Sequence, residues 1–77
     1  MPKTRELYYK KADAMRAAEE FQKLFGGYIG NTSADDRTNF SFEDERMSNM
    51  QWSGEIAAVQ VYGSREGMSG LFAWWEE

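Results

Sequence analysis

The chain of 77 residues contains neither cysteine nor histidine, and these two absences remove several kinds of chemistry. Without cysteine there is no disulfide and no thiolate metal site, and without histidine the other common zinc ligand is missing. A Ser-His-Asp triad and a Cys-His pair are excluded for the same reason. The sequence also has no P-loop and no Gly-x-Gly-x-x-Gly fingerprint. We therefore expect that the protein is not an enzyme and that it holds no cofactor or metal ion.

Proline and long apolar runs are also scarce. Pro2 is the only proline, so nothing after it prevents regular secondary structure. No segment approaches the ~20 apolar residues that cross a bilayer, and no apolar stretch follows the basic N-terminal residues as a secretory signal requires. Because the absence of cysteine suits a reducing compartment, we expect a cytoplasmic protein with no membrane segment. Neither a linker nor a repeat divides the chain, so residues 1–77 are expected to form one domain.

Aromatic residues are plentiful, with three tryptophans, four tyrosines and five phenylalanines. Each ring can bury roughly 150–250 Å² of surface. A small domain that lacks disulfides and metals depends on dense packing for its stability. The aromatic residues are therefore expected to build the core first and to offer a binding surface second.

Charge is spread unevenly along the chain, whose net charge is −4. Residues 1–25 carry six basic and four acidic side chains, whereas residues 26–77 carry three basic and nine acidic ones. An acidic protein repels phosphate groups, which disfavours direct binding of nucleic acid. An acidic surface instead suits a protein partner with a basic surface.

The N-terminal third predicts a strand followed by a helix. Residues 4–10 alternate in a strand pattern, with Leu7 and Tyr9 on one face. Asp13 fits a helix N-cap, because its carboxylate can accept a free backbone N–H. Residues 14–25 follow with an apolar stripe at helical spacing. Gly26 and Gly27 then supply the backbone freedom that ends a helix.

The remainder of the chain has a β pattern. Strands are expected over residues 28–32, 38–42, 55–62 and 71–75, with turns at 33–36 and 63–67. Residues 55–62 are apolar on both faces, which is typical of a central strand. Residues 47–53 fit either a loop or a short continuation of a strand. Trp74 and Trp75 are neighbours in the last strand, so only one of them can lie beneath the helix.

Together these elements predict a two-layer α+β fold of the order β-α-β-β-β-β. One helix would pack on a mostly antiparallel sheet of four to five strands. This arrangement leaves the second face of the sheet open, and an open aromatic face is a candidate interface.

The expected partner-binding surface combines an acidic cluster with tryptophan anchors. Carboxylates that are adjacent in a polar turn point apart and stay ionised, which suits a charged surface better than an active site. Tryptophan is a common anchor of protein interfaces. The candidate residues are Asp35, Asp36, Glu43, Asp44, Glu45, Trp52, Trp74 and Trp75.

We expect from these features a small acidic protein-binding module. A specific version is an inhibitor that occupies the basic groove of a nucleic-acid-handling complex. Small phage-encoded inhibitors, including anti-CRISPR and anti-restriction proteins, are similar in size and charge. One alternative is a binder of single-stranded nucleic acid or of a small ligand that uses an exposed aromatic sheet face. A second alternative is a structural or assembly subunit, for example a homodimer.

Overall fold

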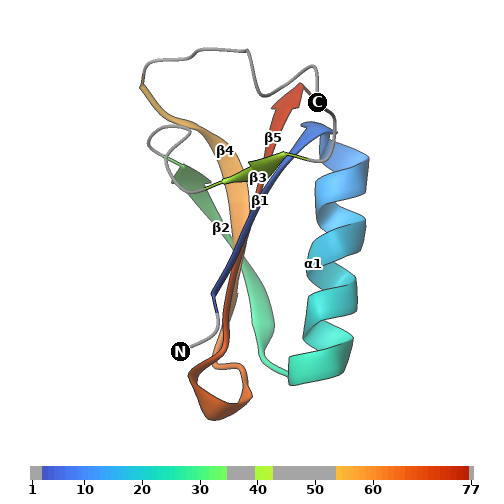
Figure 1. Ribbon diagram of the computed structural model, residues 1–77, viewed down its shortest axis with the longest axis vertical. Coiled ribbons are helices and arrows are strands. Elements are labelled where there is room, and N and C mark those ends of the chain that lie inside the picture. The colour runs from blue at the N-terminus through green and yellow to red at the C-terminus, as the bar shows by residue number, and fades with distance from the viewer. Residues whose placement is uncertain (1–2, 35–39, 43–53, 77) are drawn as a thin grey trace.

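The computed structural model describes residues 3–34, 40–42 and 54–76, which form one helix packed on a twisted sheet (Figure 1). The elements follow the predicted order β-α-β-β-β-β, with a short 3₁₀ helix, η2, added before the last strand. Their bounds are β1 (Lys3–Lys10), α1 (Lys11–Phe25), β2 (Tyr28–Ala34), β3 (Ser41–Phe42), β4 (Ile56–Tyr62), η2 (Arg65–Gly67) and β5 (Ser69–Glu76). The predicted two-layer α+β architecture is therefore confirmed.

The sheet has the strand order β2-β4-β5-β1-β3 and is mixed. β2 pairs with β4, and β4 with β5, in antiparallel fashion. β1 lies between β5 and β3 and runs parallel to both of them. β4 has a partner on each side, which confirms that residues 55–62 contain a central strand. The first and last long strands of the chain are thus neighbours inside the sheet.

Helix α1 covers one face of the sheet (Figure 1), and the main core lies between the two layers. Phe21 from the helix meets Phe72 from β5 edge to face, with 5.8 Å between the ring centroids. Trp74 lies on the same side of β5 as Phe72 and is also buried. The buried residues of this layer are Ala14, Ala18, Phe21, Val59, Val61, Phe72 and Trp74. The alternation predicted for β5 places Trp75 on the other face, as expected.

The second face of the sheet has a smaller core of its own. Leu7 and Ala73 pair across β1 and β5, and both are 0% exposed. Phe40, just before β3, is buried with them, and the guanidinium of Arg5 lies 4.6 Å from its ring centroid. The prediction of an open face is therefore wrong for the centre of the sheet.

The helix begins earlier than its sequence pattern predicts. Asp13 is not the N-cap: the helix starts at Lys11, and Lys10 holds the cap position with an extended backbone and no side-chain cap hydrogen bond. The cause is that β1 continues into α1 without a loop. Asp13 lies instead in the first turn, where a negative charge suits the helix dipole, and it pairs with Arg16 at 3.4 Å. The predicted end at Phe25 is confirmed, because Gly26 follows with a φ of 78°.

The predicted strands agree with the described residues, with boundaries that shift by one or two residues. Ser33 and Ala34, expected in a turn, belong to β2 and extend its pairing with β4. Among the described residues of the predicted strand 38–42, Ser41 and Phe42 form β3 and Phe40 lies just before it. The remaining predictions for residues 35–39 and 47–53 lie outside the described residues.

The connection between α1 and β2 depends on a glycine. Gly27 has a φ of 97°, which side chains other than glycine adopt only with strain. A Cβ atom at this position would also collide with the backbone of Tyr62, the last residue of β4, and would crowd the backbone of Ser64. Gly54 has a similar φ of 82°, but a Cβ there would meet no atom within 4 Å. A comparison of substitutions at these two glycines therefore separates the free-energy cost of the backbone conformation from that of the close contact.

We expect Gly27→Ala to destabilise the fold more than Gly54→Ala. Both substitutions pay the left-handed backbone cost of about 1–2 kcal/mol. Only Gly27→Ala must also displace the backbone beside Tyr62. Urea unfolding followed by circular dichroism gives the two free energies of unfolding. Equal losses in the two variants would contradict the close approach between this connection and the end of β4.

Candidate protein-binding surface

Most of the predicted partner-binding residues lie outside the described residues. They are Asp35, Asp36, Glu43, Asp44, Glu45 and Trp52. The structure does describe the strands that precede these residues in the sequence, however. β2 ends with Ala34 at one edge of the sheet, and β3 lies at the opposite edge. The acidic residues therefore follow, in sequence, the two strands at the outer edges of the sheet.

The net charge of the protein is carried by these same segments. Residues 3–34, 40–42 and 54–76 contain seven basic and seven acidic side chains, which cancel. The whole net charge of −4 therefore belongs to residues 35–39, residues 43–53 and Glu77. The described residues are thus neutral in sum, while the residues between β2 and β4 contribute most of the negative charge.

Trp74 is a core residue and not a surface anchor. Its side chain is 5% exposed and packs in the layer beneath α1. The ammonium of Lys11 lies 5.5 Å from its ring centroid, at the point where the helix begins. This tryptophan is therefore left out of the candidate surface, in contrast to the expectation from its place near the end of the chain.

Trp75 lies on the second face of the sheet and is only partly buried. It packs against the small core that contains Leu7 and Ala73. Part of its indole therefore remains accessible at the end of β5, immediately before Glu76. Of the predicted tryptophan anchors in the described residues, Trp75 is the one that is partly exposed.

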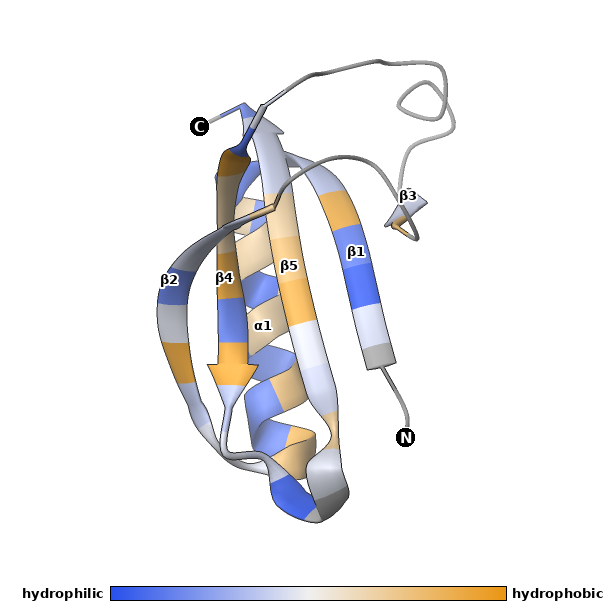
Figure 2. Cartoon of the chain, turned by 90° about the vertical axis from the view of Figure 1, so that its left-hand side faces the viewer, coloured by the Kyte–Doolittle hydropathy of each residue, from blue (hydrophilic) through white to orange (hydrophobic). Residues whose placement is uncertain are grey.

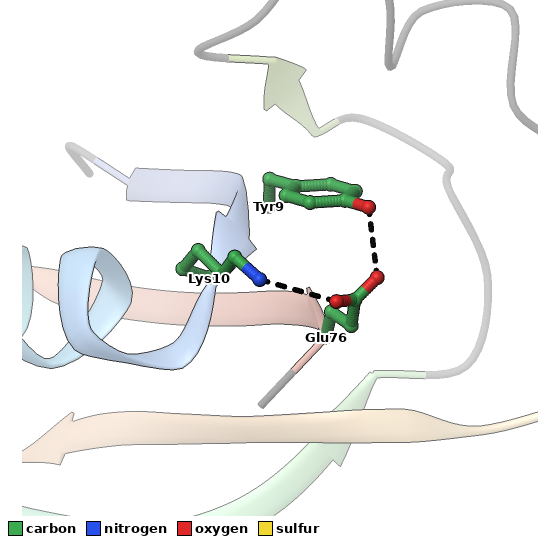
Figure 3. A network of polar contacts seen from close by, with 3 residues as sticks. All are labelled: Tyr9, Lys10 and Glu76. Atoms are coloured by element: carbon green, nitrogen blue, oxygen red, sulfur yellow. Dashed lines mark hydrogen bonds and ion pairs between the residues drawn. The ribbon is translucent and has the colours of Figure 1, made fainter.

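A polar network closes the end of the sheet beside Trp75 (Figure 3). The hydroxyl of Tyr9 donates to Oε2 of Glu76 at 2.8 Å, and Nζ of Lys10 donates to Oε1 at 3.1 Å. Lys10 and Glu76 are partners in the parallel pairing of β1 with β5, so the network ties the last residues of both strands together. The negative charge of Glu76 is thereby paired with the positive charge of Lys10.

The pKa of the Glu76 carboxyl lies below its usual range. The hydrogen bond from the Tyr9 hydroxyl is the largest cause, and the hydrogen bond and positive charge of Lys10 act in the same direction. A carboxyl with a lowered pKa in the folded state stabilises the fold above its unfolded pKa. That contribution is lost as the pH falls through the folded pKa. The group is exposed, so its effect on stability is small.

One aromatic pair on the surface was missed by the sequence patterns. Tyr28 stacks on Tyr62 with 5.6 Å between the ring centroids and an angle of 27° between the rings. Tyr28 is 65% exposed. The ring of Tyr62 lies over Gly30, where a Cβ atom would collide with it. The two tyrosines are partners at the end of the β2–β4 ladder, a relation that only the register of the strands reveals.

No three acidic side chains of the described residues come together in a way that could hold a metal ion. The side chains described above can form hydrogen bonds, pair charges and contact other groups through their aromatic rings.

We expect Tyr9→Phe to raise the pKa of Glu76 toward its ordinary value, because the substitution removes the strongest hydrogen bond to the carboxylate. An NMR titration of the Glu76 carboxyl measures this directly. Glu76→Gln should in turn weaken the loss of stability below about pH 4.3, since it removes a group that must be protonated there. A Glu76 pKa that is unchanged in Tyr9→Phe would contradict the network.

Comparisons of the chain with protein-family models, with curated proteins and with solved structures found no match. The placement of charge and of exposed aromatic rings is therefore what bears on the function.

Proposed function

We propose that the protein is a protein-binding module whose partner has a basic surface. The observation that carries the proposal is the separation of charge. The described residues are neutral in sum, and the net charge of −4 lies on residues 35–39, residues 43–53 and Glu77. Self-repulsion among acidic groups opposes a compact state, so a concentration of them has no evident benefit to the fold. Binding a basic surface gives such a concentration a use.

The proposed mechanism is electrostatic attraction followed by contact with apolar side chains. Opposite charges steer two proteins together and fix their relative orientation. Trp75, half-buried at the end of β5, supplies an aromatic contact on the described part of the surface. Because basic grooves are common in enzymes that handle nucleic acids, the proposed partner is a nucleic-acid-handling complex, which the protein would inhibit by occupying its DNA or RNA site.

The proposal includes a cytoplasmic, non-enzymatic role. The residue types needed for most catalytic constellations are missing from the sequence. In the described part of the chain, no helix is both long enough and apolar enough to cross a membrane.

We expect that a tagged form of the protein captures its partner from a lysate of its source organism at low salt and releases it at high salt. Mass spectrometry identifies the captured complex, and binding is then repeated with the purified partner. Replacement of all five acidic residues by their amides should abolish the interaction and its dependence on salt. These residues are Asp35, Asp36, Glu43, Asp44 and Glu45.

A matched pair of variants controls for total charge. The triple variant Glu43→Gln, Asp44→Asn, Glu45→Gln should weaken binding strongly. The triple variant Asp13→Asn, Glu19→Gln, Glu55→Gln removes the same charge from exposed positions of the described fold and should bind almost normally. Equal effects of the two would show that only net charge matters. Unchanged binding by the fivefold variant would refute the proposed role of the acidic segment.

A second candidate function, that of an assembly subunit, is favoured by one feature of β2. This strand forms an edge of the sheet and pairs with β4 along all seven of its residues, without a bulge. Edge strands are usually protected from further pairing by charges, proline or bulges. β2 has no charged residue and no proline. Among the described residues no strand pairs with its outer side, so a second copy could extend the sheet there.

If the protein assembles through β2, its mass in solution will exceed that of a monomer, and Asn31→Lys will restore the monomer. Asn31 is exposed at the middle of β2, where a lysine disfavours pairing with another strand. Ala12→Lys adds the same charge to an exposed position of α1 and should leave assembly unchanged. Light scattering over a range of concentrations measures the mass. A monomer at every concentration would remove this candidate.

A further inference from the structure

A groove runs between α1 and β1 on the helical side of the sheet, away from the end that carries Trp75. Its volume is about 220 Å³. The residues of β1 that line it are alternate ones, whose side chains share one face of the strand, and those of α1 fall at helical spacing. Its lining residues are Thr4, Glu6, Tyr8, Ala17, Glu20, Phe21, Leu24 and Phe72.

The groove combines an apolar base with an acidic rim. Phe21 and Phe72 are 6% and 1% exposed and meet edge to face, so they hold the floor of the groove in place from beneath. Leu24 is 67% exposed, which is high for a leucine, and supplies the accessible apolar surface of the groove. Glu6 comes from β1 and Glu20 from α1, so carboxylates reach the groove from both of its walls.

The two carboxylates have little to neutralise them. Tyr8 donates its hydroxyl hydrogen to Oε1 of Glu6 at 2.9 Å, which orients this carboxylate but adds no positive charge. Within the described residues, neither Glu6 nor Glu20 forms an ion pair. Among the described residues that line the groove there are two carboxylates and no basic side chain. A positively charged group would therefore complement this lining.

The size of the groove indicates which positively charged group would fit beside these carboxylates. Sites for drug-sized ligands usually measure about 300–1,000 Å³, and this groove is smaller. One long side chain with an apolar stem and a positive head is a better match. Arginine suits the site more closely than lysine, because its planar guanidinium presents five N–H donors and can contact aromatic rings as well as carboxylates.

We propose that this groove binds an arginine side chain of a protein partner. The methylene groups of the arginine would lie on Leu24 and Ala17, and its guanidinium would donate to Glu6 and Glu20. The inference rests on the proposed function, since the arginine belongs to the basic partner. It adds a specific contact to the general attraction of the acidic segment.

A blocked pentapeptide, Ala-Ala-Arg-Ala-Ala, tests the groove without the partner. It is titrated into the ¹⁵N-labelled protein, and amide shifts are recorded by NMR. We expect saturable shifts at the groove, centred on Glu6, Tyr8, Glu20 and Leu24, with an affinity in the millimolar range. The same peptide with citrulline in place of arginine has the same shape and no charge, and it should cause no such shifts. The lysine peptide should bind more weakly than the arginine peptide.

The double variant Glu6→Gln, Glu20→Gln should weaken binding of the arginine peptide at least about tenfold, because both charge-assisted hydrogen bonds are lost. Glu19→Gln with Glu55→Gln removes equal charge outside the groove and should not weaken it. An unchanged spectrum outside the groove verifies that the double variant is folded.

Three outcomes would overturn the arginine site: shifts away from the groove only, equal binding of the citrulline or lysine peptide, or equal binding by the double variant. None of them depends on the acidic segment. Conversely, unchanged partner capture by the fivefold variant would refute the proposed role of the acidic segment and leave the peptide titration unaffected. The two proposals can therefore fail separately.

Discussion

The parallel pairing of β1 with β5 is the constraint on which the rest of the fold depends. It joins Leu7 to Ala73 and Glu6 to Phe72, so it builds both cores at once. On one side it places Phe72 beneath α1, and on the other it closes the centre of the second face. The network of Tyr9, Lys10 and Glu76 completes this pairing at its end (Figure 3). Because β1 leads directly into α1, the pairing also sets the position of the helix on the sheet.

Local patterns predicted the elements well because their signals lie within short stretches of sequence. The stripe that includes Ala14, Ala18 and Phe21 identifies the helix, and these three side chains are buried as the pattern requires. In β5, alternation correctly separated Trp74 from Trp75. The prediction of Asp13 as the N-cap was wrong because an acidic residue near the start of a helix fits both the cap and the first turn. Only the absence of a loop after β1 distinguishes the two positions.

Relations between distant segments could not be predicted in the same way. Alternation identifies a strand but carries no information on its direction or its neighbours, so the parallel placement of β1 was not foreseen. The second core was missed for the same reason, since it joins Leu7, Phe40 and Ala73 from three separate segments (Figure 2 shows the strands that carry Leu7 and Ala73). The groove beside Glu6 and Glu20 likewise exists only because α1 lies against β1. The acidic cluster, in contrast, is visible in the sequence alone, and its structural setting lies outside the described residues.

The pairing of the first strand of the chain with the last one has a mechanical consequence. β1 and β5 are adjacent and parallel, and the ends of the chain emerge at opposite ends of this pair (Figure 1). A force that pulls the two termini apart therefore acts along the strands in opposite directions. Under such shear, the hydrogen bonds between β1 and β5 share the load and must break together, whereas bonds in an unzipping geometry break one at a time. When both ends of the chain are pulled, the resistance to unfolding is therefore expected to come from the pairing of β1 with β5.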